Sequence, residues 1–111
     1  MGKALFGSQS TATANLLEAV PVVAGAIVSK TFVDCGAGKW IVFAMDAGQS
    51  IAEHRTPFCL SVVVLDGELD FTVGGVRQTL GPGAWLYAPG NVEHDLVAKS
   101  PTRFLLNLVR A

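Results

Sequence analysis

The sequence predicts an all-β domain, a sandwich or a barrel, from three observations. Short runs of apolar or alternating residues recur along the chain about every 8–12 residues, the spacing typical of such folds. Turns that contain glycine or proline separate these runs. No segment of helical length lies between them, which argues against a parallel sheet with crossover helices. We therefore expect one domain of about eight or nine short strands.

The elements follow in chain order. Residues 1–26 are expected to form an N-terminal arm that includes a first strand and one helical turn at 15–19, which Pro21 ends. Residues 27–111 then form the barrel domain, in which Gly74-Gly75 suits a two-residue hairpin turn. The strands of this domain are expected at 27–34, 40–45, 60–65, 69–73, 76–80, 84–88, 92–98 and 103–109.

Composition narrows the class of protein. Half of the residues are hydrophobic and only 15% are charged, against roughly 25% in an average soluble protein. A small monomer of this kind would expose large apolar patches, so we expect a homodimer. The eight basic and nine acidic residues are spread singly along the chain, for a net charge of −1. The sequence therefore has no basic patch that could bind the phosphates of a nucleic acid.

The membrane and the secretory route are also disfavoured. No apolar run approaches the roughly 18–20 residues that a spanning helix needs. The N-terminus lacks the continuous apolar core of a signal peptide, so we expect a cytoplasmic protein.

The chain contains only two histidines, and each lies in a segment with a distinctive spacing. The first segment is similar to the motif Gly-x5-His-x-His-x3-Glu-x6-Gly, in which Gly48, His54 and Gly67 match. Thr56 stands at the second histidine position of that motif and Leu60 at the glutamate position.

The second segment is similar to the motif Gly-x5-Pro-x-Gly-x2-His-x3-Asn. Gly83, Pro89 and His94 match, whereas Asn91 replaces the second glycine and Ala98 the asparagine. Together the two segments resemble the paired motifs of the cupin superfamily, specifically its small single-domain RmlC-like members of unassigned function. The resemblance extends over residues 33–109 and implies a double-stranded β-helix, or jelly-roll barrel.

The resemblance also implies a metal site that this chain fills only in part. A complete cupin site joins three histidines and one carboxylate, a set that suits a divalent transition metal such as Zn, Fe, Mn, Ni or Cu. Here only His54 and His94 remain as metal ligands, and even open catalytic zinc sites usually keep three protein ligands. Two interpretations stay open: a metal at this pair, or two core histidines hydrogen-bonded to each other, to water or to Thr56.

Two further side chains are candidates for the same cavity. Along a continuous strand, alternation places Thr56 on the face that carries His54. Asn107 is a lone amide in the apolar run 104–109, either satisfied in the core or directed into the cavity. We predict a ligand site formed by His54, Thr56, His94 and Asn107, with catalytic residues unassigned.

Three functions are compatible with these residues. The first is a small-ligand-binding cupin with a degenerate two-histidine site in its barrel. The second is a metal-dependent enzyme, a small dioxygenase or an isomerase, that uses His54 and His94. The third is a sensor or partner-binding module without catalysis. The fold does not choose among them, because cupins carry many unrelated activities.

Overall fold

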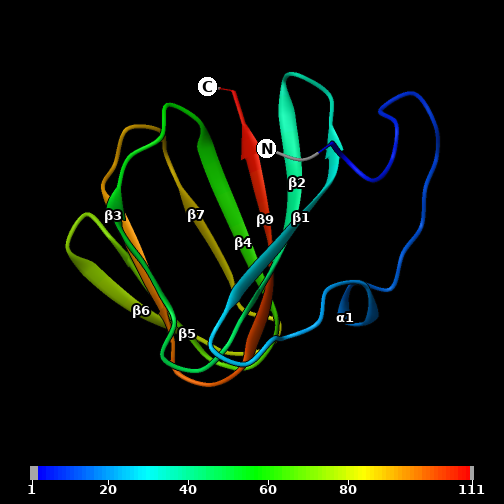
Figure 1. Ribbon diagram of the computed structural model, residues 1–111. Coiled ribbons are helices and arrows are strands. Elements are labelled where there is room, and N and C mark those ends of the chain that lie inside the picture. Colours follow the sequence, from blue (N-terminus) through cyan, green and yellow to red (C-terminus); the bar gives the residue numbers. More distant parts are fainter. Residues whose placement is uncertain (1–2, 111) are drawn as a thin grey trace.

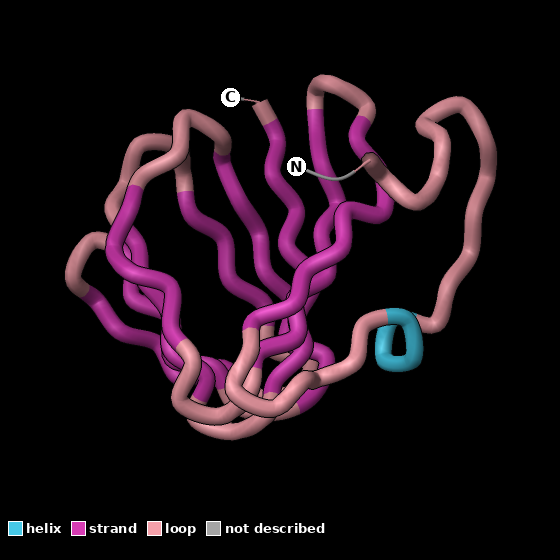
Figure 2. Tube along the Cα trace, in the orientation of Figure 1, coloured by secondary structure: helices cyan, strands magenta, loops and turns pink. Residues whose placement is uncertain are grey.

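The computed structural model describes residues 3–110, which form two facing antiparallel sheets and one short helix (Figure 1). The tube in Figure 2 shows that strands dominate and that the helix lies apart from them. This arrangement confirms the predicted all-β jelly-roll barrel. The elements are α1 (Leu16–Ala19), β1 (Ile27–Asp34), β2 (Gly38–Met45), β3 (Ser50–His54), β4 (Cys59–Asp66), β5 (Leu69–Val73), β6 (Val76–Leu80), β7 (Trp85–Ala88), β8 (His94–Ala98) and β9 (Thr102–Val109).

The strand order within each sheet follows jelly-roll connectivity. One sheet has five strands in the order β1-β2-β9-β4-β7, and the other has four in the order β3-β8-β5-β6. Consecutive strands β3 and β4 lie in different sheets, as do β6 and β7 and also β8 and β9. The chain therefore crosses repeatedly between the sheets, and the space between them becomes the interior of the barrel.

Alternation along the strands builds the main core between the two sheets. In β4, Leu60, Val62 and Val64 are buried while the residues between them are half-buried, as period-2 side chains require. Phe71 and Phe104 come from opposite sheets and are also buried. These apolar walls surround the candidate site described below.

A second, smaller core lies on the outer face of the five-stranded sheet. There Val20 and Phe32 pack with Val42 and Ala44, so the N-terminal arm covers this part of β1 and β2, as Figure 1 shows. The guanidinium of Arg103 fixes the end of the arm, because its Nε donates to the Val20 carbonyl at 2.7 Å.

The arm differs from its prediction in one respect. The helical turn is present as α1, with Asn15 capping its first turn by accepting from Leu17 N and Glu18 N. The predicted strand is absent from residues 3–26, however, and the first strand begins at Ile27. Only Leu5 and Phe6 donate backbone hydrogen bonds to the outer edge of β1, which is too short a pairing to make a strand. Among the described residues, no helix is long and apolar enough to cross a membrane.

Candidate ligand site in the barrel

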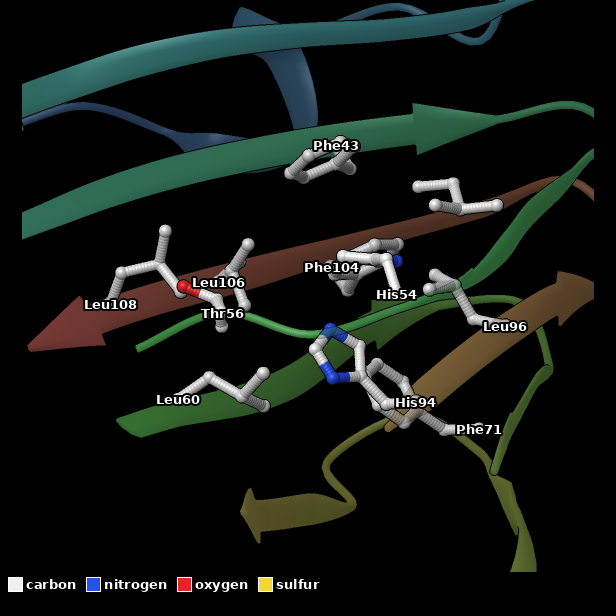
Figure 3. Close-up of a pocket in the computed structure, with 11 residues that line it drawn as sticks. Phe43, His54, Thr56, Leu60, Phe71, His94, Leu96, Phe104, Leu106 and Leu108 are labelled. Atoms are coloured by element: carbon white, nitrogen blue, oxygen red, sulfur yellow. The ribbon is translucent and has the colours of Figure 1, made fainter. Parts of the chain in front are cut away.

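A cavity of about 210 Å³ opens between the two sheets (Figure 3). Its wall is almost entirely apolar, and among residues 3–110 the only polar side chains that line it are those of His54, Thr56 and His94. The apolar wall comes from both sheets and consists of Phe43, Ile51, Leu60, Phe71, Leu96, Phe104, Leu106 and Leu108.

The two histidines meet because β3 and β8 are neighbouring antiparallel strands in which His54 pairs with His94. Their ring centroids lie 4.2 Å apart with the ring planes at 63°. His94 is only 5% exposed and stacks against Phe71 at 5.8 Å, whereas His54 lies at an exposed position on the edge strand. One imidazole is therefore set into the wall and the other stands at the mouth of the cavity.

Backbone contacts fix the protonated nitrogen of each ring. Nδ1 of His54 lies 2.8 Å from the Ala52 carbonyl oxygen, and Nδ1 of His94 lies 3.1 Å from the Val92 carbonyl oxygen. A carbonyl oxygen can only accept, so both Nδ1 atoms carry a proton and donate. Each neutral ring then keeps its lone pair on Nε2. Figure 3 shows one ring nitrogen of His94 directed toward the side of the cavity where His54 and Thr56 lie.

Burial lowers the pKa of His94 below its ordinary value of 6.5. The nearby His54 adds to this effect, while the hydrogen bond to Val92 and the charge of Asp95 oppose it. His94 is thus held in the neutral form that leaves its Nε2 able to accept.

This shift predicts that the protein loses stability as the pH falls. Below pH 6.5 the unfolded chain takes up a proton at His94 before the folded chain does, so the free energy of unfolding decreases as the pH falls through 6.5 toward the lower folded pKa. Above pH 6.5 this contribution is fully present. Urea denaturation of the native protein and of His94→Gln between pH 8 and 5 checks this, because the variant should show the shallower slope. Equal slopes would contradict it.

Thr56 reaches the cavity by a route that differs from the predicted one. The prediction placed Thr56 beside His54 by alternation along a continuous strand, but β3 ends at His54 and residues 55–58 form a loop before β4. Pro57 has no N–H to contribute to a ladder, which is consistent with this break. Thr56 nevertheless lines the cavity, and its Oγ1 accepts from Phe58 N at 3.3 Å.

The second histidine segment holds this loop in place. Asn91 N donates to the Thr56 carbonyl at 2.7 Å. Asn91 has a φ of 64°, a conformation that glycine supplies in the motif and that asparagine tolerates better than most residues. Gly90 lies so close to Pro57 that an added Cβ would be 2.6 Å from the Pro57 carbonyl oxygen. The replacement of the motif glycine by asparagine therefore preserves the turn.

Asn107 is not among the residues that line the cavity. It lies on the opposite face of β9 from Leu106 and Leu108, which do line it, and its side-chain amide donates to the Lys39 carbonyl at 2.8 Å. The structure thus brings together His54, Thr56 and His94 and separates Asn107 from them. Cys59 also faces away, with its thiol donating to the Val109 carbonyl.

Three charged side chains lie next to the two histidines in the sequence but do not line the cavity. Arg55 forms an ion pair with Glu93, and this hydrogen bond lowers the pKa of Glu93. The charge of Glu93 in turn raises the pKa of the neighbouring Glu53. None of the three lines the cavity, so no carboxylate or guanidinium group of the described residues is part of its wall.

The side chains of the site do not fit the full metal set of the family. Two Nε2 lone pairs are available, but Thr56 and Leu60 occupy the other ligand positions. No group of three or more histidine, cysteine, aspartate or glutamate side chains is placed to hold a metal within residues 3–110. Zinc sites normally need at least three protein ligands, so this pair alone gives incomplete coordination.

The apolar lining was not predicted as part of the site. Leu96 lies two residues after His94 on β8, so alternation could have indicated that it faces inward. Ile51 lies three residues before His54, and both line the cavity because the pairing of β3 with β8 shifts register between them. No pattern in the sequence, however, distinguishes an inward residue that lines a cavity from an inward residue that fills the core.

Comparison with known proteins gives the family. Residues 41–108 match the model of the cupin domain. Among solved structures, a conserved protein of unknown function from Streptococcus pyogenes is 23% identical, with a TM-score of 0.87 over 99% of this chain and 96% of that chain. An RmlC-like cupin from Desulfovibrio desulfuricans is 28% identical, with a TM-score of 0.80 over 90% of this chain and 97% of the other.

A third solved structure has a more specific name. It is a putative mannose-6-phosphate isomerase from Ralstonia eutropha, 22% identical, with a TM-score of 0.80 over 91% of this chain and all of that chain. At this identity the similarity shows the fold alone. No curated protein matched the sequence. The match of the domain model to more than half of the chain, on a jelly roll whose cavity both histidines line, shows that this chain belongs to the cupin superfamily.

Proposed function

We propose that this protein is a small-ligand-binding cupin that holds its ligand in the barrel cavity. The observation that carries the proposal is the composition of the cavity: within the described part of the chain, only His54, Thr56 and His94 place polar side chains in its apolar wall. Binding sites are typically concave and mostly apolar, with a few placed polar groups that orient the ligand.

The size of the cavity supports the same conclusion. An engineered apolar cavity of about 150 Å³ stays dry and binds benzene, so a cavity of about 210 Å³ has room for a small molecule. Polar side chains on one side would orient that molecule.

A cavity-filling substitution tests the proposal. Leu106→Phe adds volume inside the lining, whereas Val97→Phe adds it on the exposed side of β8. We expect one-ring probes such as toluene and phenol to shift amide resonances around the cavity in the native protein and in Val97→Phe, and to lose this effect in Leu106→Phe. Absence of any shift in the native protein, or equal binding by Leu106→Phe, would contradict the proposal.

The metal-dependent enzyme is the second candidate, and the two free Nε2 lone pairs favour it. Its weakness is the missing third ligand. Elemental analysis of tag-free protein distinguishes the two candidates, with the double variant His54→Ala/His94→Ala as control. Near-stoichiometric metal that disappears in the double variant would support the enzyme, and none after growth in supplemented medium would oppose it.

We also propose that the protein forms a homodimer through the aromatic face, which we define as the outward side chains of Trp40, Ser61, Trp85 and Tyr87. Trp85 and Tyr87 are 64% and 54% exposed, and both lie on β7, an edge strand. No charge protects this edge, whose sequence is Trp-Leu-Tyr-Ala, although natural edge strands usually carry such protection. The arm covers the opposite part of the same sheet, and an uncharged face can meet its own copy without like-charge repulsion.

The dimer proposal predicts that Tyr87→Arg gives a monomer. Two arginines would face each other across a two-fold axis in an apolar contact, and this is strongly unfavourable. Light scattering should then change from about twice 11.6 kDa to 11.6 kDa. Leu17→Arg, at an exposed position on α1, should stay dimeric. A native mass of 11.6 kDa at micromolar concentration would overturn the proposal.

A further inference from the structure

We propose that the cavity selects a compact, largely apolar molecule, about one ring in size, that carries one neutral hydrogen-bond donor group such as a hydroxyl or an amine. This inference rests on the ligand-binding function proposed above and names the chemistry of its ligand.

Volume sets the size of the molecule. A cavity of about 210 Å³ is larger than the roughly 150 Å³ that accepts benzene. It is smaller than the roughly 300–1,000 Å³ of pockets that hold drug-sized ligands. One ring with a short substituent fits these limits, whereas a nucleotide sugar or a disaccharide is too large.

The wall excludes molecules that are polar all round. Aromatic and branched apolar side chains line it from both sheets, among them Phe43, Phe104 and Leu108. A sugar would bury several hydroxyl groups against this wall without partners, and each unpaired group carries a desolvation cost. The body of the ligand must therefore be apolar.

The histidines determine which polar group the ligand carries. Both Nδ1 protons are already donated to the backbone, at Ala52 and Val92, so each Nε2 presents only a lone pair. Two acceptors with ring centroids 4.2 Å apart call for a donor on the ligand. A carboxylate brings only further acceptors, and it would also bury its charge against a mostly apolar wall.

Thr56 completes the polar side of the cavity. Its Oγ1 accepts from Phe58 N at 3.3 Å, and the hydrogen bonds between described residues include no acceptor for its hydroxyl proton. This proton can bond to a lone pair of the same ligand group. A hydroxyl can donate to one Nε2 and accept from Thr56, and an amine has a second N–H for the other Nε2, so both groups match this polar side of the cavity.

The test compares four one-ring probes of similar size on the full chain at pH 8: phenol, aniline, toluene and benzoate. Binding is measured by NMR titration of the protein amides. We expect phenol and aniline to bind about five- to tenfold more tightly than toluene, the gain from one net hydrogen bond. Benzoate should bind more weakly than toluene.

A variant at His54 tests whether this residue causes the preference for phenol and aniline over toluene. His54→Phe keeps a ring of similar shape at a position that is exposed and therefore tolerant of change. It should keep toluene binding and lose most of the preference for phenol and aniline. Val97→Phe, on the exposed side of β8, should behave as the native protein does.

The outcomes distinguish a failure of this inference from a failure of the proposed ligand-binding function on which it rests. If toluene binds as tightly as phenol, or benzoate binds best, the donor requirement is wrong although the cavity still binds ligands. If none of the four probes shifts the resonances of cavity residues, the proposed function itself fails, and this inference fails with it.

Discussion

Gly67→Ala is expected to cost about 2–5 kcal/mol of unfolding free energy, while Gly48→Ala costs only about 1–2 kcal/mol. Both glycines have a positive φ, 85° and 81° respectively, so both substitutions share the strain of a left-handed backbone. They differ in the space around them. An added Cβ at Gly67 would overlap the Pro101 carbonyl oxygen and Thr102, whereas nothing lies within 4 Å of one at Gly48.

The overlap at Gly67 has no easy relief. Thr102 is fully buried, and its Oγ1 accepts from Glu68 N and lies within donating distance of the carbonyl oxygens of Ser100 and Glu68, at 2.8 and 3.1 Å. The adjacent Asp66 carboxylate accepts from the backbone and the guanidinium of Arg103. Moving this turn would disturb all of these contacts together.

Urea denaturation of the two variants beside the native protein measures the difference. Domains of this size have about 5–15 kcal/mol of stability in total, so Gly67→Ala should unfold at a much lower urea concentration. Equal midpoints for the two alanine variants would show that the turn yields at little cost, contrary to the close packing in the structure.

The fold was predictable from the sequence because its signals are local. Period-2 alternation in segments such as 69–73 and turn residues such as Gly74-Gly75 act within a few residues, and the eight strands expected within residues 27–109 all formed. The strand β3 was not among the strands predicted, because Ser50–His54 lacks an apolar run. Its place in the sheet depends on pairing with β8, which is remote in sequence.

The site was predictable only in part, because its decisive features come from tertiary contacts. The pairing of His54 with His94 was anticipated from the two motifs. The state of their nitrogens depends on backbone carbonyls that only the folded loops and strands bring into position. Thr56 enters the cavity from a loop that Asn91 holds, not from a strand. For Asn107, a half-buried amide on the outer face of β9, the sequence offered no way to decide which face it occupies.

The position of Thr56 leads to the largest change in binding that one substitution should produce. Thr56→His places a third imidazole in the lining beside His54 and His94, where the family motif has its second histidine. Three neutral imidazoles with an open position form the ligand set of a catalytic zinc site. We therefore expect Thr56→His to hold close to one zinc or nickel ion per chain after dialysis.

Phe58→His is the matched control, because it adds the same imidazole two residues away on the same loop but outside the cavity lining. The native protein and Phe58→His should retain little metal by elemental analysis, since two imidazoles leave coordination incomplete. Equal metal in all three proteins would show that threonine at this position does not limit binding. Metal retained by Thr56→His alone would show that one residue separates this apolar ligand site from a metal centre.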